Sequence, residues 1–171
     1  MKAAFAAIDR LVEIAVVVIF LAIVLVGTGQ VVNRYFFNVS LSWSEEFQRY
    51  GQIWIIFLSI PIAYRRGIHI GLEMLHPYFS ERGHRIFIFV IDALWLTLAS
   101  AIVLGLYQLM QVLRFQTSPG MGLPMHWVYS GMLIGALYLI LVALRRLVAN
   151  LRGRLAEEMP PASGSELPVA E

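Results

Sequence analysis

Three carboxylates within or beside the apolar segments of this chain are the groups whose types and positions could do chemistry. Glu45 and Glu46 open one apolar segment, and Asp92 is the only charge inside another. A carboxylate within a membrane span is a candidate proton relay or ion ligand. Asp92 follows Arg85 by only seven residues, about two helical turns, and is shallow enough to be hydrated. This position favours structural pairing of Asp92 over a role in ion coupling.

Other reactive residue types are missing or badly placed for catalysis. The chain has no cysteine, which excludes disulfides, thiolate metal sites and cysteine nucleophiles. His69, His76 and His84 fall in one connecting segment and His126 opens the last apolar segment, so no two histidines face each other to ligate haem. The sequence also contains no HExxH motif, glycine-rich phosphate loop or Ser–His–Asp grouping. We therefore expect no enzymatic activity, cofactor or metal site.

The elements that position these groups are membrane helices. Of 171 residues, 59% are hydrophobic and 14% charged, which predicts an integral membrane protein. Four apolar segments predict an all-α fold of four transmembrane helices, at about 11–32, 43–64, 86–113 and 125–144. Residues 1–150 then form the membrane domain, and 151–171, with several Pro, Ser and Glu, are predicted to be a disordered tail. The net charge of +2, with no basic run, gives no reason to expect a nucleic-acid partner.

The basic residues predict the orientation of these helices. Ten Lys and Arg residues precede the first segment, lie between the second and third, or follow the fourth. Only Arg34, Arg49 and Arg114 fall in the two other connections or beside them. Loops rich in Lys and Arg stay on the cytoplasmic side. The sequence therefore predicts that both termini, and with them the tail, are cytoplasmic.

The second apolar segment is amphipathic at its start. Ser42 followed by Glu45 forms a capping signal for a helix N-terminus. Helical spacing then places aromatic side chains on one face and polar side chains on the other: Trp43, Phe47, Tyr50 and Trp54, against Glu45, Gln48, Arg49, Gln52 and Ser59. Glu46 lies between the two faces.

Two interpretations of this polar stripe remain open. Glu45 and Glu46 are at the right spacing to pair with Arg49 locally, as a solvated helix start beside an aromatic belt. Alternatively, the stripe docks to a partner protein. The uncharged stretch Tyr50–Tyr64 has only 15 residues, about 22 Å, against a hydrocarbon core of ~30 Å. A span must therefore draw charges into the bilayer, which favours docking.

Two groups of residues carry a resemblance to a known family. The first is Trp43-Ser-Glu-Glu46 with Arg49, Trp54, Arg66 and His69-Ile70, and the second runs from Ser118-Pro119 to Pro124, with Trp127 and Tyr129. In this order the sequence resembles the small permease (Q-type) subunit of tripartite ATP-independent periplasmic (TRAP) transporters, over about residues 8–147. It departs at Glu73, where members often have Asp, and at Leu133-Ile134-Gly135, where many carry a proline.

The resemblance implies a multi-pass subunit of the bacterial inner (plasma) membrane. Such a subunit scaffolds a large multi-span permease, which performs ion-coupled symport of organic acids such as dicarboxylates or sialic acid delivered by a periplasmic substrate-binding protein. The expected partner-interface residues are Trp43, Glu45, Glu46, Arg49, Trp54, Arg66 and His69. The alternative function is a self-sufficient small membrane transporter or a redox membrane anchor. Deep carboxylates or a haem-binding histidine pair would favour it, and the sequence offers neither.

Overall fold

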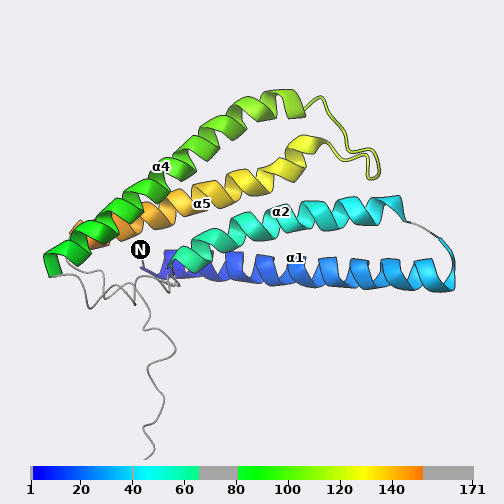
Figure 1. Cartoon of the computed structure of the whole chain (residues 1–171), viewed down its shortest axis with the longest axis horizontal. Helices are drawn as coiled ribbons and strands as arrows, with labels where there is room; N and C mark the ends of the chain where they lie inside the picture. The colour runs from blue at the N-terminus through cyan, green and yellow to red at the C-terminus, as the bar shows by residue number, and fades with distance from the viewer. Residues whose placement is uncertain (1, 40, 66–80, 152–171) are drawn as a thin grey trace, which may run out of the picture.

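The described part of the chain folds into four long helices. The computed structural model describes residues 2–39, 41–65 and 81–151. Its helices are α1 (Lys2–Phe36), α2 (Ser42–Arg65), α4 (Glu81–Leu113) and α5 (Met125–Leu151) (Figure 1). Within these ranges no β-strand forms, so the predicted all-α fold with four helices is confirmed. Three helices of the described part, α1, α4 and α5, are long and apolar enough to cross a membrane.

The helices extend past the apolar segments that predicted them. The structure continues α1 back to Lys2 and α5 on to Leu151, where the apolar segments begin near residue 11 and end near residue 144. These added turns carry charge yet are packed, since Asp9 and Arg146 are both buried. Charge ends a hydropathy signal but not a helix when the charged groups find partners. Apart from Leu151, the predicted tail lies outside the described residues, as do Arg66 and His69 of the predicted partner interface.

The helices lie side by side in the order α1, α2, α5, α4 (Figure 1). Each packs on its neighbour in that order, so α5 is inserted between α2 and α4. The chain's N-terminus and the last turns of α5 lie at one end of this layer, which we call the terminal end. The α1–α2 connection and the α4–α5 loop lie at the other, which we call the loop end. Towards the loop end the α4–α5 pair diverges from the α1–α2 pair.

Small residues bring α2 and α5 together at the centre of the layer. A Cβ atom added at Gly131 would lie 2.5 Å from the Trp54 ring, and one at Gly135 would collide with the carbonyl oxygen of Phe57. Close approach through small residues is a common way for membrane helices to pack. The buried core around this crossing contains Val12, Leu58, Tyr64, Ala99, Tyr138, Leu139, Val142 and Ala143.

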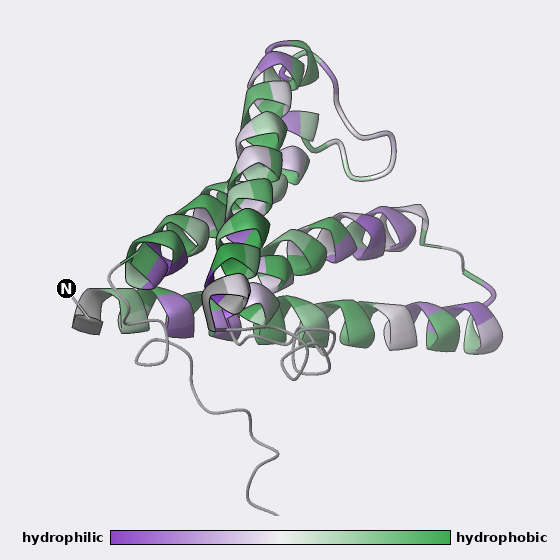
Figure 2. Cartoon of the chain, turned by 60° about the vertical axis from the view of Figure 1, so that its left-hand side comes forward, coloured by the Kyte–Doolittle hydropathy of each residue, from purple (hydrophilic) through white to green (hydrophobic). Residues whose placement is uncertain are grey.

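The outer surfaces of α1 and α4 are apolar. Leu11, Phe20 and Leu25 on α1 are more than half exposed, as are Leu94 and Leu104 on α4. Figure 2 shows hydrophobic colour along most of both helices, with hydrophilic colour gathered towards the ends. Apolar residues exposed in this number are what a bilayer solvates. The first half of α2 differs, because hydrophilic residues continue along it (Figure 2).

Candidate partner-docking site

The start of α2 is fixed by local contacts before it meets any other helix. Ser44 is completely buried, and its hydroxyl donates a hydrogen bond to the carbonyl of Leu41 at 2.6 Å. The rings of Trp43 and Phe47 meet edge to face with centroids 6.5 Å apart. Trp43 remains 40% exposed. The aromatic side of the first two turns is thus ordered and partly open at the surface.

Glu46 holds the α4–α5 loop against α2. Its carboxylate accepts hydrogen bonds from the backbone N–H groups of Gly120 and Met121, each at 2.9 Å, and from the hydroxyl of Ser118. Gly120 permits this approach, because an added Cβ would lie 3.0 Å from the carboxyl carbon of Glu46. Gly122 turns the loop back with a φ of 65°. Sequence reasoning missed this contact, although the Ser-Pro-Gly turn was visible as a source of free N–H groups.

Trp54 and Tyr50 also point towards α5. The Trp54 ring N–H donates to the carbonyl of Val128 at 3.0 Å, while the ring itself packs over Gly131. The Tyr50 hydroxyl lies 3.8 Å from the sulfur of Met125. Glu46 and Trp54 are therefore engaged within the chain. Their part in partner docking stays a prediction.

The polar face of α2 turns towards α1, and residues of both helices border an open hollow at the surface. The Gln48 side-chain amide donates to the Gln30 side chain on α1 at 2.8 Å and lies 3.2 Å from the carbonyl of Ser44. Around this link lies a hollow of about 390 Å³ lined by Gln30, Glu45, Gln48, Arg49 and Gln52. We call it the α1/α2 hollow. Every side chain that lines it is polar or charged.

The two charged residues of the hollow form no ion pair with a described residue, although the charge of Arg49 lies close enough to Glu46 to interact with it. Glu45 and Arg49 are both exposed, and neither forms an ion pair or a side-chain hydrogen bond there. The local pairing with Arg49 that helical spacing allowed for Glu45 is therefore not formed. Glu45 and Arg49, about one helical turn apart, are therefore accessible to charged or polar groups of another molecule. Of the other predicted interface residues, Arg66 and His69 are not described.

The terminal end contains the opposite arrangement, in which charges are satisfied between helices. Arg65 of α2 lies between two carboxylates of α1, at 2.5 Å from Asp9 and 2.6 Å from Glu13. Asp9 is buried and also accepts a hydrogen bond from the hydroxyl of Tyr138 on α5, at 2.5 Å. A second basic residue near Asp9 is Arg145 of α5, which lies 4.0 Å from it. This network joins α1, α2 and α5.

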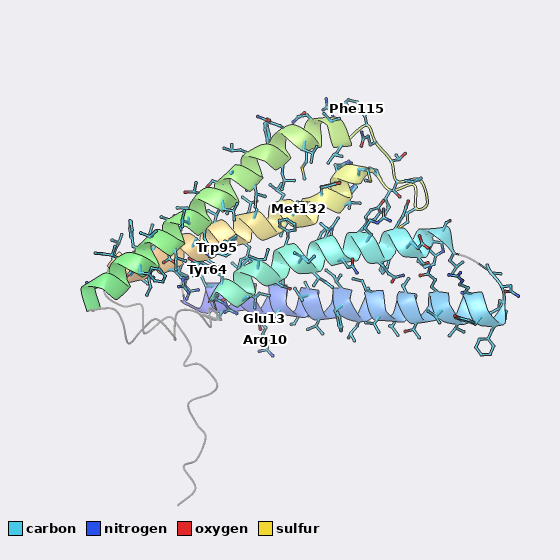
Figure 3. All side chains as sticks on the ribbon, in the orientation of Figure 1. Arg10, Glu13, Tyr64, Trp95, Phe115 and Met132 are labelled. Carbon is cyan, nitrogen blue, oxygen red and sulfur yellow. The ribbon has the colours of Figure 1, made fainter. Side chains whose placement is uncertain are left out.

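Asp92 belongs to a second network at the terminal end. It is only 1% exposed and accepts hydrogen bonds from the Tyr64 hydroxyl and, at 3.3 Å, from Arg146. Arg146 also donates to the backbone carbonyl of Tyr64 at 2.9 Å and stacks over its ring at 4.4 Å. Tyr64 in turn meets Trp95 with ring centroids 5.5 Å apart, between α2 and α4 (Figure 3). These contacts join α2, α4 and α5.

Structural pairing of Asp92 is thus observed, but in a different setting from the one predicted. Its described basic partner is Arg146 on α5, not the nearby Arg85, and it is buried instead of hydrated. Arg85 contributes its backbone carbonyl to the side chain of Asn150 at 3.2 Å. Sequence reasoning counted Arg146 only among the basic residues that follow the fourth apolar segment, because a partner 54 residues away leaves no local signal.

Residues 23–153, about three quarters of the chain, match the family model described as tripartite ATP-independent periplasmic transporters, DctQ component. The chain belongs to this family. As a TRAP permease subunit it is a transport component and not an enzyme, and it is a multi-pass protein of the inner membrane.

Three relatives support this assignment. Two TRAP transporter small permease proteins of Haemophilus influenzae are each 28% identical to the chain, one over 71% of this chain and 75% of the relative, the other over 61% and 64%. The isethionate TRAP transporter permease protein DctMQ of Oleidesulfovibrio alaskensis is 31% identical to the chain in an alignment that covers 64% of this chain. The chain spans only 18% of the length of that protein and slightly less than two thirds of the second Haemophilus relative.

Proposed function

We propose that this TRAP subunit is a scaffold that binds the large permease subunit and holds it in the bilayer. In the assembled transporter, the large subunit performs ion-coupled symport of organic acids such as dicarboxylates or sialic acid. A periplasmic binding protein delivers the substrate to the complex. The described residues of this chain contribute contacts to the partner and no step of transport.

The observation that carries this proposal is the position of α2. It packs between α1 and α5, two helices that are long and apolar enough to cross a membrane. By the same measure of length and composition, α2 is not among the helices that could cross a membrane. Its Trp54 side faces α5, and Gln48 links it to α1. The remaining polar side chains at its start would face hydrocarbon if nothing covered them, and a protein neighbour removes that cost.

The fused relative supports the identity of the neighbour. In the DctMQ protein of Oleidesulfovibrio alaskensis, the segment similar to this chain is 18% of a much longer permease protein. One polypeptide there carries both parts, so the two parts work at the same place in the membrane. We extend this association to the present chain, where Trp43, Glu45 and Arg49 are exposed among the described members of the predicted docking set. Glu46 and Trp54 support that surface from inside.

The test is affinity purification of the tagged chain from its native membrane in a mild detergent, followed by mass identification of what co-purifies. A large multi-span permease in equal amount is the expected result. Recovery of the chain alone, or only with copies of itself, would contradict the proposal and favour a self-sufficient transporter. A haem absorption band in the purified chain would instead favour a redox anchor. An unrelated membrane protein of similar size with the same tag controls for non-specific capture.

A further inference from the structure

The α1/α2 hollow reaches into the apolar layer, that is, the hydrocarbon core of the bilayer. Arg65 follows Arg49 by 16 residues along α2, which is about 24 Å of helix against a hydrocarbon thickness of ~30 Å. When Arg65 lies at one boundary of that layer, Arg49 therefore lies inside the other boundary. Gln52 lies almost one turn deeper. On α1, Gln30 stands about two turns before the end of the helix at Phe36.

The hollow is also kept open by the fold itself. Gln48 and Gln30 bind each other across the two helices at 2.8 Å, so these amides fix the spacing of α1 and α2 at this level. Gly27 leaves room for Gln48, since an added Cβ would lie 3.2 Å from its side-chain oxygen. Glu46, the other carboxylate of the first turns, is bound to the α4–α5 loop, so it forms no ion pair with Arg49 although the two charges lie close enough to interact. Glu45 and Arg49 are thus presented together at the edge of a polar hollow.

We propose that the α1/α2 hollow is the binding site, or seat, of a polar membrane segment of the large permease. That segment places an acidic group opposite Arg49 and a basic or N–H group opposite Glu45. This inference rests on the proposed scaffold function and names the surface that performs it. Lipid tails offer no hydrogen-bond partner at the depth of Arg49, so its charge needs a partner from protein. Glu45 is 20 residues from Arg65, about 30 Å of helix, and lies at the boundary of the hydrocarbon. Because Glu45 and Arg49 are four residues apart on a helix, the complementary groups lie about 5–6 Å apart, as on neighbouring turns of a partner helix.

The apolar edge of the layer makes a matched comparison. On α4, large apolar residues such as Leu94, Leu98 and Leu104 are at least half exposed, as for a surface that faces lipid. Leu104 lies nine residues before the end of α4, and Gln52 lies ten residues after the start of α2, both counted from the loop end. Each position therefore lies within about ten residues of the loop end of its helix, one on the inner helix α2 and the other on the edge helix α4.

The experiment uses the absence of cysteine from the chain. Gln52→Cys and Leu104→Cys variants, each labelled with a thiol-reactive photo-crosslinker, are illuminated in native membranes that contain the whole transporter. We expect a covalent adduct of this chain with the large permease from position 52, and at least about tenfold less of it from position 104. Arg49→Glu should lower recovery of the permease in affinity purification by roughly tenfold, because like charges then meet at the seat. Arg49→Gln should lower it by less.

The outcomes separate this inference from the scaffold function. Strong crosslinking from position 104 with none from position 52 would place the permease on α4 and overturn the seat, while the scaffold function would stand. Normal permease recovery with Arg49→Glu would also overturn the seat. A crosslink from position 52 to a second copy of this chain would show that the hollow binds another copy and not the large permease, and would overturn the proposal. Failure of the unmodified chain to recover any permease would overturn both proposals.

Discussion

At the terminal end of the layer, Arg65 and Arg146 form ion pairs with carboxylates of other helices, whereas at the loop end Arg49 forms no ion pair with a described residue. Both ends carry arginines and carboxylates. The difference is in where the carboxylates point: Asp9 and Asp92 turn into the layer and are buried, while Glu45 stays on the surface. Polar groups that are satisfied within the chain stabilise its own fold. Polar groups left open within the membrane point to an assembly.

This contrast assigns different roles to residues of the same type. The terminal-end networks join all four helices through Asp9, Arg65, Asp92 and Arg146, so they fix the helix order that the apolar surfaces alone leave free. The loop end has one internal anchor, Glu46, and one open hollow. Substitutions at the two ends are therefore expected to fail in different assays.

The largest effect is expected from Arg146→Met. Removing the arginine leaves Asp92 buried without its described basic partner, which costs about 3 kcal/mol or more. The measurement is the thermal unfolding midpoint of the purified chain in detergent, together with the yield of folded protein. Adding Asp92→Asn should recover part of the loss by removing the buried charge. Arg10→Met is the control, because Arg10 is exposed at the same end and projects away from the layer (Figure 3). Equal unfolding of both variants would show that the network does not hold α5.

Gly135→Ala should be the next most damaging change. The new methyl group would collide with the backbone carbonyl of Phe57, which cannot move aside as a side chain can, and separating α2 from α5 should cost roughly 1–3 kcal/mol. The same assay applies. Gly105→Ala on α4 meets nothing within 4 Å and should leave stability unchanged or raise it by up to ~1 kcal/mol. A neutral Gly135→Ala would mean that the crossing is looser than the structure places it.

Trp54→Phe should have a smaller effect, since it keeps an aromatic ring over Gly131 but removes the donor to the carbonyl of Val128. One interhelical hydrogen bond is worth on the order of 1 kcal/mol in a membrane protein. Trp127→Phe is the matched control, because Trp127 is 63% exposed at the start of α5. If Trp127→Phe lowered stability as much as Trp54→Phe, the hydrogen bond of Trp54 to Val128 would not be the cause of the loss.

The smallest effect on the isolated chain is expected from Arg49→Gln. Arg49 has no ion pair to lose within the described residues, so stability should change by less than about 0.5 kcal/mol. The unfolding midpoint of the chain without its partner is the measurement. Destabilisation as large as that of Arg146→Met would make Arg49 a residue of the chain's own fold and erase the difference between the two ends.

The sequence by itself determined the fold class, the number of helices and the family. Hydropathy and helical spacing act over neighbouring residues, so four apolar segments and the polar start of α2 could be read locally. The same local signal showed that Tyr50–Tyr64 is too short an apolar stretch to span alone, in agreement with the absence of α2 from the spanning helices of the described chain.

Only the tertiary structure decided which polar residues are already used. Glu45 and Glu46 are adjacent and equivalent by type, yet one faces the α1/α2 hollow and the other binds a loop more than 70 residues away. The placement of α5 between α2 and α4 creates both this contact and the pairing of Asp92 with Arg146. Each of these contacts depends on how helices pack across the layer. No spacing along the chain encodes that packing, because membrane helices associate through the fit of whole surfaces.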